Sequence, residues 1–154
     1  MSEYRNVSEV IYNSDHSKFV GMECNKAMAI MDVDAIHSKL GNPKDHYMLI
    51  ESKHLNESIK SRQLDGLRCL DKMFKGNAEI EYHGGWISFA KFSKEKGFEV
   101  AYMCSVDDFS KVYHIDNAAR YIAICEMKIS PSRYNIEKGM LVVQVGKEWK
   151  LVNK

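Results

Sequence analysis

The segment YMLIESKHLNESIKSRQLDGL, residues 47–67, carries the most informative pattern of the chain. It begins as the apolar run of a buried strand, and then places Glu51 and Lys53 where further apolar residues would be expected. Side chains alternate between the two faces of a strand, so Glu51 and Lys53 share one face with Leu49. An acid on the inward face of a strand is costly to bury unless it is paired or binds an ion.

A helix is expected to follow this strand, over about residues 56–74, with Asn56 as its N-cap. Gly76 is expected to end the element. Gln63 lies at helical spacing from the apolar residues, so it belongs to the inward stripe of the helix, where an amide needs hydrogen-bond partners. The apolar members of this stripe are Ile59, Leu67, Leu70 and Phe74.

Another strand is expected just upstream, in AMAIMDVDAIHSK, residues 27–39. The stretch 40–46 contains Gly, Asn, Pro and Asp, which favour a turn, so the two strands are expected to form a hairpin. Asp32 and Asp34 share one face of the upstream strand. The hairpin would bring one of these two carboxylates beside Glu51 and the lysine that follows it.

The remaining segments predict an α/β or α+β domain, with a mixed central sheet flanked by helices and a β-rich C-terminal part. HGGW, residues 83–86, is expected to form a turn, because two adjacent glycines favour one. The surrounding residues do not match the sequence pattern of a phosphate-binding loop. A short helix is expected at 3–13, and strands at 18–23, 86–92, 98–105, 111–115, 121–129, 140–145 and 149–152.

Two carboxylates and an ammonium would thus converge at the end of a buried sheet. Neighbouring carboxylates repel unless a cation neutralises them, and Mg²⁺ favours such hard oxygen ligands. A bound metal can polarise a phosphate and lower the pKa of a coordinated water. A lysine beside that water can orient it and can stabilise charge on the phosphate. The predicted arrangement therefore suits hydrolysis of phosphodiester bonds.

The succession MDVDAIHSK, YMLIESKH and SRQLDGL resembles the PD-(D/E)XK nuclease superfamily. In that pattern an Asp at a strand end is followed by an apolar strand ending in Glu-x-Lys, and often by a helix that bears Gln. The resemblance implies that Asp34 and Glu51 bind Mg²⁺ or Mn²⁺. It also implies that Lys53 is the catalytic lysine, and Gln63 matches the glutamine of the helix.

The resemblance leaves some assignments open. Some members add a Glu from the first helix, for which Glu9 is the best candidate here and Glu23 a second choice. The Asp of the pattern is often preceded by Pro, but this sequence reads DVD at 32–34, so the choice between Asp32 and Asp34 stays open, with Asp34 favoured. The residues expected to contact nucleic acid are Lys39, His54, Lys60 and Arg62.

The resemblance covers about residues 5–105 and implies a restriction-endonuclease-like fold, with 106–154 as a β-rich extension of one domain, 1–154. It implies a DNA substrate, with RNA as an alternative, and products with 5′-phosphate ends. Many members act as dimers or tetramers, so a homodimer or larger homo-oligomer is expected.

The composition agrees with a globular protein and excludes other classes. The chain of 154 residues has a net charge of +1, which is low for a dedicated nucleic-acid coat protein. No apolar run approaches the roughly 20 residues of a membrane span, and the polar N-terminus has no signal core, so a cytoplasmic protein without membrane association is expected. Four scattered cysteines predict buried reduced thiols rather than a disulfide framework.

Two other functions remain open at this point. The domain could be an inactive nucleic-acid-binding or protein-binding module on a nuclease-like scaffold, although a retired site has no chemical need to keep Asp, Glu and Lys together. The compact size also fits an accessory protein that inhibits a host enzyme.

Overall fold

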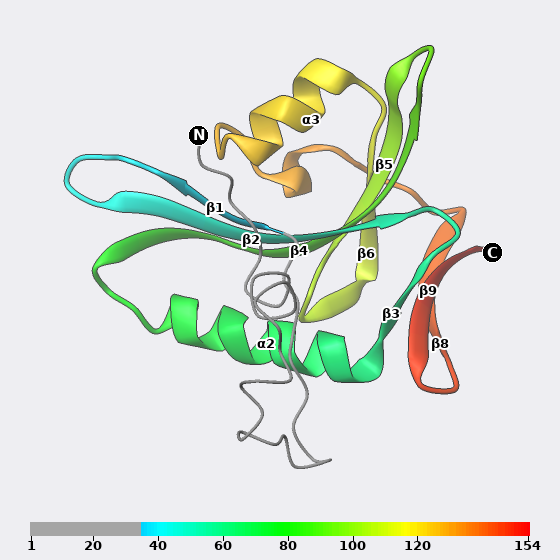
Figure 1. The fold of residues 1–154 in the computed structure, drawn as a ribbon, viewed down its shortest axis with the longest axis horizontal. Coiled ribbons are helices and arrows are strands. Elements are labelled where there is room, and N and C mark those ends of the chain that lie inside the picture. Colours follow the sequence, from blue (N-terminus) through cyan, green and yellow to red (C-terminus); the bar gives the residue numbers. More distant parts are fainter. Residues whose placement is uncertain (1–34) are drawn as a thin grey trace, which may run out of the picture.

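The first two strands that the structure describes form the predicted hairpin. The structure, a computed structural model, describes residues 35–154. Strand β1 (Ala35–Lys39) pairs antiparallel with β2 (Asp45–His54), in a register that runs from Ala35↔Ile50 to Lys39↔His46 (Figure 1). A Cβ atom at Gly41 would meet the carbonyl oxygen of Lys44, so this tight turn requires glycine.

Strand β2 lies next to β4 (Ile80–Ser93), and the two strands are parallel. Helix α2 (Ser61–Lys75) lies between them in the chain and packs against β4. The prediction of a turn at HGGW was wrong, because these residues lie within β4. Gly84 has a φ of +96° there, close to a register shift in the pairing with β2, and a bulge of this kind lets the strand continue.

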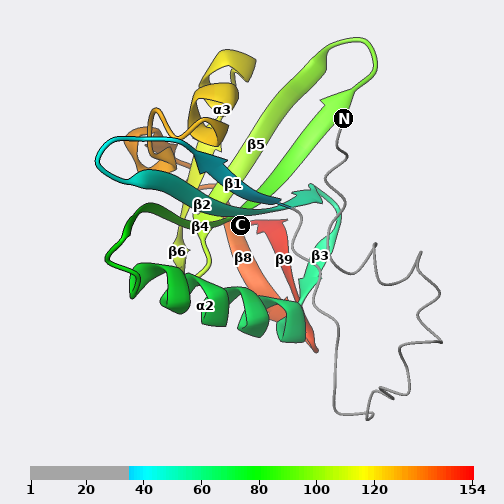
Figure 2. The same cartoon turned by 60° about the vertical axis from the view of Figure 1, so that its left-hand side comes forward.

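Within residues 35–154, the central sheet has six strands in the order β1-β2-β4-β5-β6-β7, and every neighbouring pair except β2 and β4 is antiparallel. A second sheet of three antiparallel strands has the order β3-β9-β8 (Figure 2). The strands not yet introduced are β3 (Ser58–Lys60), β5 (Gly97–Ser105), β6 (Asp108–Ile115), β7 (Asn135–Ile136), β8 (Met140–Val145) and β9 (Glu148–Asn153).

Helix α2 begins later than predicted. Residues 58–60 form β3 instead of a first helical turn, because Ile59 is fully buried and pairs with Trp149 of β9. The residue before the helix is Lys60 rather than Asn56, and it makes no side-chain capping bond. The predicted end at Gly76 is confirmed, since the amide of Gly76 donates to the carbonyl of Lys72.

The strand predicted at 121–129 was wrong, because helix α3 (Ala118–Cys125) occupies most of it. Asn117 caps this helix by accepting a hydrogen bond from the amide of Arg120 at 3.2 Å. The helix buries Ile124 against the sheet. A short apolar run fits a strand or a buried helix equally well, and here the cap and the two alanines at its start favour the helix. A 3-10 turn (Pro131–Arg133) follows.

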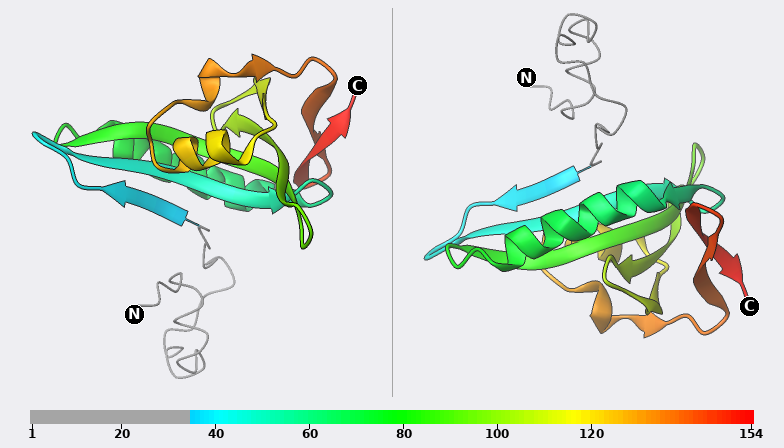
Figure 3. Two further views of the ribbon diagram at one scale, coloured as in Figure 1. Left: turned by 90° about the horizontal axis from the view of Figure 1, so that it is seen from above. Right: turned by 90° about the horizontal axis from the view of Figure 1, so that it is seen from below.

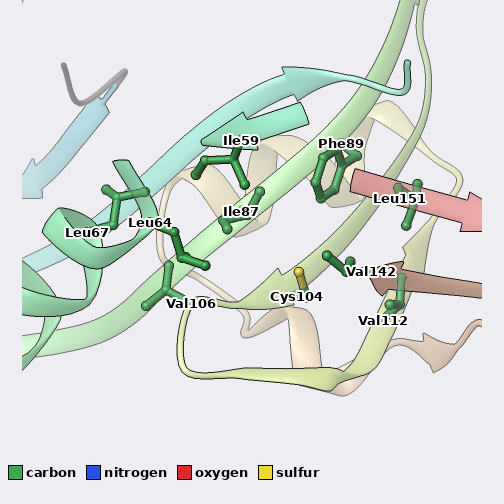
Figure 4. Close-up of a cluster of buried hydrophobic side chains, with 10 residues drawn as sticks. All are labelled: Ile59, Leu64, Leu67, Ile87, Phe89, Cys104, Val106, Val112, Val142 and Leu151. Atoms are coloured by element: carbon green, nitrogen blue, oxygen red, sulfur yellow. The ribbon is translucent and has the colours of Figure 1, made fainter. Parts of the chain in front are cut away.

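Helices α2 and α3 cover opposite faces of the central sheet, which gives the α+β class predicted from the sequence (Figure 3). Each face has its own hydrophobic cluster. The cluster on the α3 face contains Met48, Ile50, Trp86, Ala90, Ala101, Met103, Ile115, Ile124 and Met127. The cluster on the α2 face, shown in Figure 4, contains Ile59, Leu64, Leu67, Ile87, Phe89, Cys104, Val106, Val112, Val142 and Leu151.

Within residues 35–154, no helix has the length and apolar character that crossing a bilayer demands. Cys104 is buried, as expected, but Cys125 is only half-buried and Cys69 is exposed, so among the described cysteines the prediction of buried thiols is confirmed at Cys104 and was wrong at Cys69.

Candidate active site

Glu51 is a charged residue in the hydrophobic core. Strand β2 crosses the middle of the structure with four consecutive buried residues, Met48 to Glu51, and only 1% of Glu51 is exposed. Its backbone neighbour on β4 is Ile87, a member of the cluster on the α2 face. A carboxylate buried among such side chains must be hydrogen-bonded or paired to be tolerated.

Gln63 supplies one of these partners from the first turn of α2. Its amide Nε2 donates to Oε1 of Glu51 at 2.6 Å. This contact confirms the expectation that Gln63 lies on the inward side of the helix and contacts a polar group. A hydrogen bond to an ionised acceptor is stronger than one between neutral groups, so the amide fixes the direction of the carboxylate.

Lys53 supplies the opposite charge. Its ammonium Nζ lies 3.8 Å from Oε1 of Glu51, and its side chain is 20% exposed. Lys53 stands on the same face of β2 as Glu51, as the alternation of the strand requires, and pairs with Phe89 of β4. The ammonium therefore contacts a buried carboxylate and still reaches solvent, which is what a group that meets a substrate needs.

The other carboxylates expected at this site lie outside the described residues. Asp34 and Asp32 precede β1, and Glu9 and Glu23 lie further towards the N-terminus. In the part of the chain from 35 to 154, no group of three or more His, Cys, Asp or Glu side chains could hold a metal ion. Glu51 is thus the single predicted ligand that the structure describes.

Lys60 and Arg62 lie close to Gln63 in the chain and face a cavity. The cavity has a volume of about 660 Å³ and is formed between the start of α2 and the β8–β9 turn. It is lined by Lys60, Ser61, Arg62, Asp65, Val145, Lys147 and Glu148. Three of these side chains are cationic and two are anionic, and Lys147 joins Lys60 and Arg62 there. Glu51, Lys53 and Gln63 do not line this cavity.

The structure does not bring Lys39 to this site. Lys39 pairs with His46, at the end of the β1–β2 hairpin opposite to Ile50. Its ammonium donates to the carbonyl of Glu126 at 2.9 Å, just beyond the last residue of α3. Lys39 therefore stabilises the C-terminal end of α3, where a cation is favourable.

His54 belongs to the turn that ends β2. Its Nδ1 accepts a hydrogen bond from the amide of Asn56 at 3.3 Å, and its own amide donates to Oε1 of Glu57 at 2.7 Å. The amide of Glu57 also donates to the carbonyl of His54 at 2.9 Å. These hydrogen bonds of His54 stabilise the turn that follows β2.

Asp71 is a second buried carboxylate, which sequence reasoning missed. Its Oδ1 accepts from the hydroxyl of Tyr82 at 2.7 Å, and its Oδ2 lies 2.8 Å from the ammonium of Lys75. Lys75 also contacts Asp107 at 2.7 Å. Hydrogen bonds to Asp107 and then to Asp71 raise the pKa of Lys75, while burial and the bond to Asp71 raise the pKa of Tyr82. This network joins α2 to the sheet on the face that carries Glu51.

A histidine pair lies at the other end of β2. Nδ1 of His46 lies 2.8 Å from Nε2 of His83. Burial, and then the neighbouring His46, lower the pKa of His83. One imidazole of the pair donates to the other, which accounts for one ring nitrogen of each side chain.

Comparison of the chain with protein-family models, with curated proteins and with solved structures finds no match.

Proposed function

We propose that this protein is a metal-dependent nuclease that hydrolyses phosphodiester bonds, with DNA as its substrate and 5′-phosphate ends on its products. The observation that carries the proposal is the trio of Glu51, Lys53 and Gln63. A buried carboxylate is held by an amide from a neighbouring helix and lies beside a lysine that reaches solvent. Pairing makes the buried carboxylate tolerable, and the exposed fraction of Lys53 lets the same ammonium meet a substrate from solvent.

The topology supports a restriction-endonuclease-like fold as part of this proposal. Strands β1 and β2 form an antiparallel hairpin, and β2 runs parallel to β4 with α2 between them in the chain. The carboxyl ends of β2 and β4 therefore point in the same direction, and Lys53 lies at the end of β2. Residues near such strand ends are well placed to meet a substrate outside the sheet.

The proposal takes Asp34 as the second carboxylate. The described register ends with Ala35 opposite Ile50. If the same register continued by one residue, position 34 would face Glu51, which is the juxtaposition that ligation of one ion requires. Asp32 and Glu9 stay alternatives for additional ligands.

Mg²⁺ or Mn²⁺ fits the described donor, because a carboxylate oxygen is the ligand type that these hard cations prefer. Glu51 and Asp34 would hold the ion, which when bound would supply charge stabilisation to the phosphate and a more acidic water. Lys53 would hydrogen-bond the attacking water or a non-bridging phosphate oxygen through its ammonium. Gln63 would keep the carboxylate of Glu51 in one orientation through the 2.6 Å bond.

Cleavage of supercoiled plasmid tests the proposal. Wild-type protein is incubated with plasmid in Mg²⁺, in Mn²⁺ and in EDTA, and nicked product is followed by gel electrophoresis. We expect nicking with either metal and none in EDTA. Glu51→Gln and Lys53→Met should each lower the rate by about 100-fold or more, the size of effect seen when one stabilising group is removed.

Lys44→Met is the matched control, because Lys44 is exposed in the turn between β1 and β2. It should cut at the wild-type rate. Absence of metal-dependent nicking by the wild type would refute the nuclease, and tight DNA binding in that case would support the inactive binding module. Equal rates for wild type and Lys53→Met would point to a contaminating enzyme.

A further inference from the structure

The hairpin between β4 and β5 concentrates positive charge. The segment KFSKEKG, residues 91–97, contains three lysines and one glutamate, whereas the whole chain has a net charge of +1. Lys91, Lys94 and Lys96 are all exposed. Figures 1 and 2 show this hairpin projecting from the body of the molecule.

The hairpin begins next to the site described above. Lys53 of β2 pairs with Phe89 of β4, and both lie on the α2 face of the sheet. Lys91 follows Phe89 by two residues, so its side chain leaves β4 on that same face. Because β2 ends at His54, opposite Ala90, the lysines of the hairpin continue the direction of β2 beyond its end.

The hairpin is anchored at its base. Phe92 pairs with Phe98 across the two strands, with ring centroids 5.6 Å apart. Phe98 stacks on Tyr121 of α3 at 4.7 Å, and the hydroxyl of Tyr121 lies 2.9 Å from that of Ser88. These contacts fix the direction in which the hairpin leaves the sheet, so its lysines are presented without a large ordering cost on binding.

The ammonium groups of the three lysines are not used in contacts with the described part of the protein. Within the part of the chain that the structure describes, the ammonium groups of Lys91, Lys94 and Lys96 make no ion pair and no hydrogen bond, although the backbone amide of Lys96 donates to Oγ of Ser93 at 3.0 Å. Other lysines do have such partners: Lys75 contacts two aspartates, and Lys128 contacts Glu126 at 3.3 Å. Several exposed cations on one hairpin, close to the proposed catalytic site, suit a polyanion whose charges repeat along its length.

We propose that the β4–β5 hairpin is a second substrate-binding arm, which binds the phosphate backbone of DNA through Lys91, Lys94 and Lys96. The inference rests on the proposed function in one respect, since it takes the same nucleic acid as the ligand. It does not require turnover. The arm would hold the strand on the far side of Lys53 from the cavity that Lys60 and Arg62 line.

Binding measured without cleavage tests the arm. Full-length protein is titrated against a fluorescein-labelled 20-base-pair duplex in EDTA, and fluorescence anisotropy gives the dissociation constant at several salt concentrations. Lys94→Glu/Lys96→Glu should raise the dissociation constant about tenfold or more, and should reduce the slope of log affinity against log salt by about 2. Lys94→Gln/Lys96→Gln should act in the same direction with a smaller effect.

The matched control is Lys44→Glu/Lys72→Glu. It makes the same change in charge at two exposed lysines near the opposite end of the sheet, where Asp45 pairs with Ile80 and α2 has its last turn. Thermal unfolding of both double variants checks that they are folded.

The outcomes separate this inference from the nuclease. Equal dissociation constants for the hairpin variant and the control would overturn the arm, even if the wild type cuts plasmid. A wild type that does not bind the duplex at all would also overturn it. A wild type that binds through the hairpin but never cuts would support the arm and refute the nuclease.

Discussion

The amide of Gln63 donates to Oε1 of Glu51 at 2.6 Å, and this bond joins the first turn of α2 to the centre of β2. Twelve residues separate the two positions in the chain. The contact brings Glu51 and Lys53 of β2 together with Gln63 of α2. It also means that the geometry of Glu51 depends on how α2 packs against the sheet.

Removal of this amide should therefore destabilise the fold. Gln63→Ala leaves the buried carboxylate of Glu51 with one donor fewer, at a cost of about 1–3 kcal/mol in the free energy of unfolding. Chemical denaturation in urea at neutral pH measures the change. Gln144→Ala is the control, because Gln144 is exposed and makes a 3.4 Å bond to Ser61; it should lie within about 0.5 kcal/mol of the wild type. Equal stabilities for the two variants would mean that the amide contributes nothing to holding Glu51.

The sequence predicted the relative placement of Glu51, Lys53 and Gln63 because β2 and α2 follow local rules. Alternation in β2 placed Glu51 and Lys53 on one face, and helical spacing placed Gln63 inward. The turn residues at 40–46 correctly predicted the hairpin that β1 and β2 form around them. The second carboxylate proposed there, Asp34, lies outside the described residues and stays a prediction.

The features that the sequence did not reveal depend on contacts distant in the chain. Strand β3 exists because Ile59 pairs with Trp149, a partner about 90 residues away whose position no local pattern records. In the sequence, Asp71 looks like an ordinary surface residue four positions before Lys75. Its burial depends on the fold, which places the hydroxyl of Tyr82 in contact with it. The apolar run that became α3 was ambiguous, because its length suits either type of element.

Tyr82→Phe should reveal how much the second buried carboxylate depends on its hydroxyl donor. Tyr82 donates to Asp71 at 2.7 Å, and Asp71 is only 2% exposed, so loss of the hydroxyl should cost about 1–3 kcal/mol. Tyr47→Phe is the matched control. Tyr47 pairs with Tyr82 across β2 and β4, and its hydroxyl makes no hydrogen bond within the described residues. Urea denaturation should place Tyr47→Phe within about 0.5 kcal/mol of the wild type.

His83 should make the stability of the protein depend on pH in the mildly acidic range. Burial, and then the nearby His46, lower the pKa of His83, so the unfolded chain binds a proton more readily at this position than the folded chain. Its contribution to stability is therefore complete above the unfolded pKa of about 6.5 and is lost as the pH falls through the lowered value. His83→Gln removes this titration, so stability should fall less between pH 7.5 and pH 5.5 in the variant than in the wild type. Urea denaturation at both pH values measures the two differences, and a wild type whose decline is no steeper than that of His83→Gln would contradict the assignment.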